Sequence, residues 1–254
     1  MKVYKLPLFF LIITLISVSC TKSTPVLISG ELKTWHDIIL TIDGPSTSEY
    51  DTVNPFTDYK LEVTFSNGTQ EIIIPGYFAA DGNAAETSAR EGNKWRVHFC
   101  PPFKGDWNYT VSFLKGKNIA ISADDQAGDP VEGNGFKGII NISETDKTAP
   151  DFRAKGRLEY TGERYLRHAG SGEYFLKGGT DSPENLLGYN DFDGTYYGGN
   201  NKTRTGEASP NKGLHTYDPH ISDWRAGDPE WKNGKGKGII GGLNYLSSKG
   251  ANSI

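Results

Sequence analysis

The stretch KWRVHFCPPFKGDWNYTVSF, residues 94–113, decides the fold. Apolar side chains stand at every second position from Trp95 to Phe99, and again from Trp107 to Phe113, with mainly polar residues between them. Successive side chains of a β-strand point to opposite faces, so each run predicts a strand that is buried on one face. The turn PPFKGD joins the two strands.

Neighbouring segments repeat this pattern. KLEVTF (60–65) alternates in the same way, and Asn67-Gly68 then supplies turn residues before the apolar run EIIIPGYF, which is a hairpin signal. GNGFKG (133–138) has dinucleotide-loop spacing, but an acidic loop precedes it and the β-like IINIS follows it, so we interpret it as a turn into a last strand. The sequence predicts a mainly β protein with an antiparallel sandwich of immunoglobulin type over residues 28–145.

Composition excludes several functions. The 254 residues carry 27 basic and 31 acidic side chains, a net charge of −4, which provides no basic field for nucleic acid. The G-x-S-x-G, P-loop and H-E-x-x-H motifs are missing from the sequence, which excludes the easily recognised serine hydrolases, NTPases and zincins. We therefore expect no nucleic-acid partner and no cofactor.

The N-terminus predicts export. Lys2 and Lys5 precede the apolar run LPLFFLIITLISV (6–18), which is too short for a membrane span of ~20 residues and ends in SVSC. SVSC resembles the lipobox of bacterial lipoproteins. That resemblance implies a signal peptide over 1–19, a lipid on Cys20, a tether over 20–27, and a place at the bacterial outer membrane or in the periplasm. Ordinary cleavage without a lipid is the alternative.

After the polar linker SETDKTAPD the pattern changes. A short hairpin (RYLRH, turn GSGE) leads into the apolar YFLKGG. Ile239, Leu243 and Leu246 have helical spacing ahead of Gly250, which predicts a helix over 238–249, and ANSI then resembles the start of a strand. We interpret 146–254 as the N-terminal part of a (β/α)₈ barrel, with YFLKG and ANSI as its first strands. A complete barrel needs about 250 residues.

The segments WHDIILTIDGP, NPFTDYKLEVTF, PGYFAADGN and NKWRVHFCPPFKGDWNYTVSF together resemble a known family. It is the immunoglobulin-like domain of unknown function that precedes the catalytic barrel in many bacterial glycoside hydrolases. With the barrel-like opening, the resemblance runs from Trp35 to Ile254. It implies the N-terminal portion of an exported glycoside hydrolase acting on a polysaccharide or oligosaccharide, whose catalytic carboxyls and remaining barrel lie beyond residue 254. The alternative is a small second domain that ends at Ile254.

Two loops carry candidate substrate contacts. The first follows the predicted barrel strand YFLKG, on the side where barrel active sites lie, and the second is HTYDPHISDW (215–224). An aromatic face can cover a sugar ring while carboxylates and amides bind its hydroxyls. The candidates are Asp181, Asn185, Tyr189, Asp191, His215, Asp218, His220 and Trp224. Loop solvation and local capping explain the first loop equally well. Trp224 and Trp231 also fit as anchors that hold the long excursion 194–237 on the barrel, and for Trp231 this is the favoured interpretation.

We expect no metal site. His215 and His220 are five positions apart with Pro219 between them, so they do not share a helix face. NDFDGT (190–195) is only a fragment of a calcium-loop pattern. No catalytic residue can be named from the sequence. Two other functions stay open: a non-enzymatic carbohydrate-binding surface lipoprotein, and an adhesin-like sandwich that contacts proteins.

Overall fold

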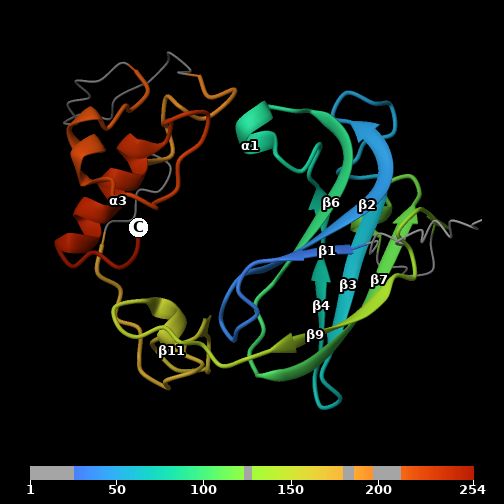
Figure 1. The fold of residues 1–254 in the computed structure, drawn as a ribbon, viewed down its shortest axis with the longest axis horizontal. Coiled ribbons are helices and arrows are strands. Elements are labelled where there is room, and N and C mark those ends of the chain that lie inside the picture. Colours follow the sequence, from blue (N-terminus) through green and yellow to red (C-terminus); the bar gives the residue numbers. More distant parts are fainter. Residues whose placement is uncertain (1–25, 123–127, 180–185, 197–212) are drawn as a thin grey trace, which may run out of the picture.

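The computed structural model describes residues 26–122, 128–179, 186–196 and 213–254 (Figure 1). The predicted signal peptide with Cys20, and the candidates Asp181 and Asn185, lie outside these residues. The described chain is mainly β, with antiparallel sheets and few helices. Within it, none of the helices combines the length and the apolar character needed to cross a bilayer.

The first sheet contains four antiparallel strands in the order β1-β2-β6-β5. Its strands are β1 (Val26–Ser29), β2 (Ile38–Ser48), β6 (Glu91–Phe99) and β5 (Tyr77–Phe78). Between β5 and β6 lies the short helix α1 (Ala84–Thr87).

The second sheet has the order β4-β3-β7, with β8 and β9 paired to successive parts of β7. Its strands are β4 (Glu71–Pro75), β3 (Tyr59–Ser66), β7 (Gly105–Lys115), β8 (Asp129–Pro130) and β9 (Lys137–Ile142). A 3₁₀ turn, η1 (Ile119–Ile121), follows β7.

The alternating apolar residues of both sheets meet in one hydrophobic core, as the sequence pattern predicts. Phe65 of β3 stacks on Phe99 of β6 with ring centroids 3.9 Å apart and planes 6° from parallel. Phe99 in turn meets Trp107 of β7 edge-on at 5.2 Å. Because these contacts join strands of different sheets, the two sheets pack face to face.

The turn PPFKGD does not close a hairpin. β6 belongs to the first sheet and β7 to the second, so the turn carries the chain across the core. The turn after β3 does close the β3–β4 hairpin. It spans four residues, with Asn67 N–H donating to the Gln70 carbonyl at 3.2 Å and Gly68 at φ 87°. GNGFKG forms the turn into β9, as expected, with Gly133 and Gly135 both at positive φ.

The second part of the chain is less regular. Among its described residues, the elements are η2 (Phe152–Ala154), β10 (Leu158–Glu159), β11 (Arg167–His168), η3 (Asp218–Asp223) and α3 (Lys237–Ser248). The predicted hairpin around GSGE is present, with a bridge between Arg167 and Tyr174.

The two predicted barrel strands are not strands in the structure, so an incomplete barrel is not shown. Apart from the bridge at Tyr174, neither YFLKG nor ANSI enters a ladder. The two segments nevertheless lie side by side. The Asn252 N–H donates to the Gly178 carbonyl at 2.7 Å, and the Gly178 N–H donates to the Asn252 side chain at 2.7 Å.

The predicted C-terminal helix is present as α3. Its end forms a Schellman motif, in which Gly250 at φ 92° donates to Ser247 and Ala251 donates to Leu246. Three of the buried residues of α3 are glycines, namely Gly238, Gly241 and Gly242. A Cβ at Gly241 would lie 1.8 Å from the His220 carbonyl oxygen, so only glycine lets η3 approach the helix backbone this closely.

Candidate functional site

The two predicted substrate loops meet in the structure. Tyr189 and His215 form a parallel bridge, with the His215 N–H donating to Gly188 at 2.7 Å and the Asn190 N–H donating to His215 at 2.9 Å. This bridge brings Tyr189, Asp191 and His215 into one cluster. Gly238 of α3 lies behind this bridge, and a Cβ there would lie 2.4 Å from the Thr216 carbonyl oxygen and 3.2 Å from the Tyr189 hydroxyl, so glycine is needed at this position.

Asp191 is the hub of this cluster. Its carboxylate accepts hydrogen bonds from the Tyr189 hydroxyl at 2.7 Å and from the Gly236 N–H at 3.0 Å. Burial works to raise the pKa of Asp191, but these two donors outweigh it, so its pKa lies below the usual value. Burial and the neighbouring carboxylate raise the pKa of Tyr189 to about 12. Asp191 is therefore anionic and Tyr189 neutral across physiological pH.

Aromatic rings surround this hub. Phe192 stacks on Trp231 with centroids 5.7 Å apart and planes 6° from parallel, and the Trp231 indole N–H donates to the Asp191 carbonyl at 3.3 Å. Tyr189 packs on Tyr217 at 5.7 Å. Trp231 thus anchors the segment after η3 onto the loop around Asp191, which is the anchoring role the sequence suggests for it.

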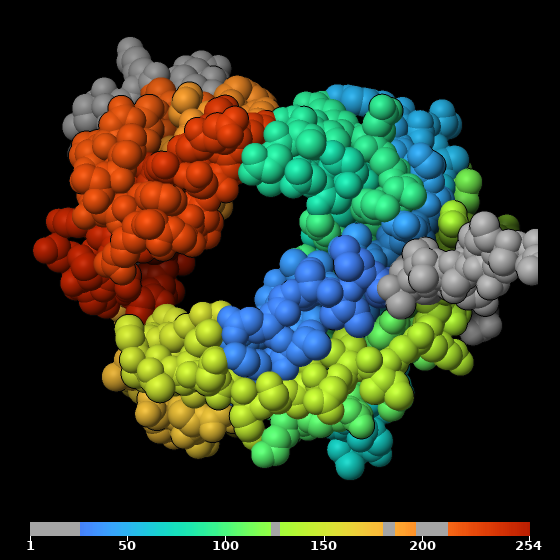
Figure 2. Space-filling model, in the orientation of Figure 1, coloured from blue at the N-terminus to red at the C-terminus, as the bar shows by residue number. Residues whose placement is uncertain are grey.

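A pocket of about 320 Å³ opens beside the stacked pair, lined by Phe192, Asp193, Trp231 and Ala85 of α1. It lies where the second part of the chain touches the sandwich. Lys232 donates its backbone N–H to Glu86 at 2.8 Å, and its ammonium lies 2.5 Å from the Asp193 carboxylate. Figure 2 shows an opening bounded by the blue and teal residues of the sandwich, by yellow-green residues below, and by the orange and red C-terminal residues, which touch the sandwich above it.

The other predicted residues lie on or next to η3. Asp218 is exposed at its start. His220 is within 3.0 Å of Asp223 and packs on Tyr245 of α3 at 4.7 Å. The Lys237 ammonium covers the Trp224 ring at 4.2 Å from its centroid. None of these three predicted residues is among those that line the pocket.

The pocket residues Phe192 and Asp193 were not among the predicted substrate contacts, and Trp231 was predicted only as an anchor. A signal was available in NDFD (190–193), where acidic and aromatic residues alternate at the end of the loop predicted to follow the first barrel strand. Its pairing with Trp231 could not be found, because the two positions are about forty residues apart and meet only through tertiary contacts.

The described carboxyls suit substrate holding better than proton donation. Hydrogen bonds from Lys232 and Ser88 lower the pKa of Asp193, and the Arg225 N–H and the Asn244 amide lower that of Asp228. A general acid in glycoside cleavage needs a raised pKa. The pKa values of Asp191, Asp193 and Asp228 are shifted in the opposite direction.

A separate charged cluster lies where the sandwich meets the linker. Ligand atoms of Glu31, His36 and Asp146 lie within 4.8 Å of one another, the spacing of a metal site. The Lys33 ammonium lies 2.9 Å from Glu31 and 2.6 Å from Asp146, and Lys147 also reaches Glu31 at 3.1 Å. The ammonium groups of Lys33 and Lys147 neutralise these carboxylates, so we interpret the cluster as an ion-pair network and not as a metal site.

Comparisons with known proteins find a family match for the first part of the chain. Residues 31–114 match a family described as a domain of unknown function (DUF5060). One similar solved structure, from Bacteroides vulgatus ATCC 8482, is described as a "putative glycoside hydrolase". The identity is 20% and the TM-score 0.37, over 63% of this chain and 26% of that one, so this chain spans about a quarter of that protein's length. No curated protein matches this chain.

Proposed function

We propose that the chain is the N-terminal portion of an exported glycoside hydrolase acting on a polysaccharide or oligosaccharide. The proposal takes residues 28–145 as an immunoglobulin-like accessory domain. The strand order supports this, because β1-β2-β6-β5 and β3-β7-β9 correspond to the A-B-E-D and C-F-G orders of immunoglobulin domains. It takes residues 146–254 as the opening of the barrel, which the contact between Asn252 and Gly178 supports.

The observation that carries the proposal is the Phe192–Trp231 stack beside Asp193 at the pocket. Sugars present C–H groups on their ring faces and hydroxyls at their edges. Aromatic faces bury the first, and anionic carboxylates accept hydrogen bonds from the second. The pocket combines both kinds of group within a few side chains.

In this proposal the described residues hold the glycan and do not cleave it. Cleavage needs one carboxyl as acid and a second as nucleophile or base, about 5 to 10 Å apart. The lowered pKa values of Asp191 and Asp193 suit hydrogen-bond acceptance. We therefore place the catalytic pair in barrel residues that follow position 254.

Export and anchoring belong to the same proposal. Lys2, Lys5 and the apolar run before Cys20 support a lipidated N-terminus at the outer membrane or in the periplasm. Labelled palmitate should enter the protein in a bacterial host and should not enter the Cys20→Ser variant. Equal labelling of both proteins would refute the anchor.

A non-enzymatic carbohydrate-binding lipoprotein is the second candidate. The pocket favours it, because the described residues that line it already combine two aromatic rings with a carboxylate. Sequencing the native coding DNA past the codon for Ile254 separates the two. An open frame with alternating strands and helices supports the hydrolase, whereas a stop codon there supports the binding protein.

Calorimetry tests the glycan site itself. Oligosaccharides from mixed-linkage β-glucan, galactomannan, arabinoxylan and arabinogalactan should include at least one ligand with micromolar to millimolar affinity. Phe192→Ala should weaken that binding at least tenfold, because it removes half of the aromatic stack. Tyr196→Ala is the control, since Tyr196 lies in the same loop and is 82% exposed. Equal affinities for both variants would contradict the site.

A further inference from the structure

We propose that the sandwich carries a second, separate glycan site: a pocket at its edge that holds one sugar ring. The proposal depends on the proposed function only for the class of ligand. Its described residues lie on β3, β5 and β6, in the loop before β3, at the end of β4 and in η1, and none of them is among the described residues that line the pocket at Phe192. No role is assigned to these residues by the match to the family of unknown function.

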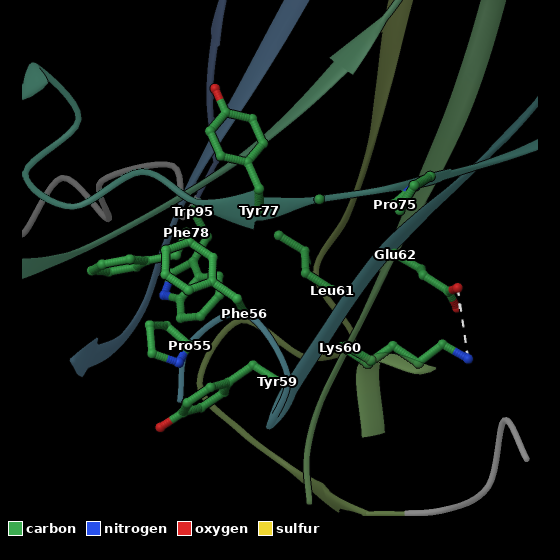
Figure 3. A pocket seen from close by; sticks show the side chains of 12 residues that line it. Pro55, Phe56, Tyr59, Lys60, Leu61, Glu62, Pro75, Tyr77, Phe78 and Trp95 are labelled. Atoms are coloured by element: carbon green, nitrogen blue, oxygen red, sulfur yellow. Dashed lines mark ion pairs between the residues drawn. The ribbon is translucent and has the colours of Figure 1, made fainter. Parts of the chain in front are cut away.

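The pocket has an aromatic floor. It measures about 140 Å³ and lies between the two sheets, where Tyr59 of β3 meets Phe78 of β5 and Trp95 of β6 (Figure 3). Ring centroids are 5.1 Å apart for Tyr59 and Trp95, and 5.2 Å apart for Phe78 and Trp95. These three rings are almost fully buried and fixed by core packing, so the floor is preorganised.

The wall of the pocket keeps an aromatic ring exposed. Phe56 meets Phe78 edge-on at 6.4 Å, yet it is 55% exposed. An engineered cavity of 150 Å³ takes up benzene, so a pocket of about 140 Å³ has room for the ring of one sugar while its hydroxyls project beyond the pocket. A sugar ring that enters would cover Phe56 and remove its apolar surface from water.

Polar groups lie on the other side of the pocket. Lys60 and Glu62 point out beyond Leu61, opposite Phe56 and Phe78, and their charged atoms are 3.7 Å apart (Figure 3). The Glu62 carboxylate can accept hydrogen bonds from ring hydroxyls. An apolar floor with charged groups at one edge fits the two-sided surface of a sugar better than a purely apolar ligand.

The same edge is poorly suited to bind a peptide strand. Pro75 has no N–H, and the Gly76 N–H already donates to the Leu61 carbonyl at 2.7 Å. A Cβ at Gly76 would lie 2.4 Å from the Leu61 side chain, so glycine keeps this edge closed. Because neither Pro75 nor Gly76 has a free N–H, an added peptide strand would find no donor at these two positions. A ring-shaped ligand is therefore the better occupant of the pocket.

The test uses the full chain with ¹⁵N-labelled tryptophan indoles. The sequence has five tryptophans, so each indole N–H gives one resonance that a Trp→Phe variant assigns. The probes are methyl glycosides of glucose, galactose, mannose, xylose, arabinose, rhamnose and fucose. At least one should shift the Trp95 resonance saturably. Phe56→Ala should weaken this response at least fivefold. Phe103 is also 55% exposed but lies outside the pocket lining, so Phe103→Ala is the matched control and should leave the response unchanged.

The outcomes separate this inference from the proposed function. A Trp95 shift that survives Phe192→Ala and is lost in Phe56→Ala supports the second site, whatever happens at the first pocket. No saturable Trp95 shift with any probe overturns it, and so does a shift that Phe56→Ala leaves intact. Glycan binding that only Phe192→Ala weakens leaves the proposed function standing and removes the sandwich site.

Discussion

Gly241 and Gly242 of α3 form a natural pair for testing how the candidate site is held. Both are buried helix residues, and alanine at either position should gain about 1 kcal/mol in helix propensity. At Gly241 the new Cβ would lie 1.8 Å from the His220 carbonyl oxygen and 3.1 Å from the Trp224 backbone nitrogen. At Gly242 none of the residues that the structure describes would lie within 4 Å of the new Cβ.

The difference between the two variants isolates the clash, because the propensity gain cancels. Overpacking of this kind costs about 1 to 3 kcal/mol, and here the obstacle is backbone that has no alternative rotamer. The Gly241→Ala helix should therefore be less stable than the Gly242→Ala helix by about that amount. In amide exchange this corresponds to roughly 5- to 150-fold faster exchange.

Hydrogen exchange of the full chain measures this directly. Peptides covering 237–248 should lose protection in Gly241→Ala and gain it in Gly242→Ala, while peptides from β3 and β7 stay unchanged in both. Equal protection of α3 in the two variants would refute the close approach of η3 to the helix, and with it the positioning of His220 and Trp224.

Two further predictions concern stability. Phe65→Ala should cost about 3 to 5 kcal/mol in urea unfolding, because Phe65 is fully buried and stacked on Phe99, whereas Phe103→Ala should change it by less than about 0.5 kcal/mol; a loss below about 1 kcal/mol for Phe65→Ala would contradict the core. Hydrogen bonds from Arg153 lower the pKa of Asp151 to about 2 from its usual 3.8. The carboxylate therefore stabilises the fold above about pH 4, and this contribution disappears as the pH falls toward 2. Asp151→Asn should flatten the decline of the urea midpoint over that range, and an unchanged slope would argue against the ion pair.

The strands and the β3–β4 hairpin were predictable from the sequence, but the other strand neighbours were not. Alternation in KLEVTF, KWRVHF and DWNYTVSF identifies a buried face, and each of these runs is a strand with that face in the core. Alternation carries no information on which strand lies beside it. For that reason the crossing of PPFKGD between the sheets appeared only in the structure.

The candidate site was likewise predictable only in the part that depends on local sequence. Tyr189, Asp191 and His215 were predicted from local loop chemistry, and the structure brings them together. The pocket beside them depends on contacts between distant segments. Ser88 and Asp193 are 105 positions apart, and hydrogen-bonding capacity alone does not specify such pairs. In the second part of the chain, the apolar runs YFLKG and ANSI were read as strands, whereas the structure gives them side-by-side contacts without a ladder.

The indole resonance of Trp231 offers the most direct test of glycan contact at the candidate site. Its N–H donates to the Asp191 carbonyl, and its ring lines the pocket. Titration with the oligosaccharide that binds best in calorimetry should shift this resonance saturably, with the same affinity. The Trp107 indole is fully buried, donates to the Phe103 carbonyl at 2.9 Å, and should not move. A Trp231 resonance that stays fixed while the oligosaccharide saturates the protein would contradict the site.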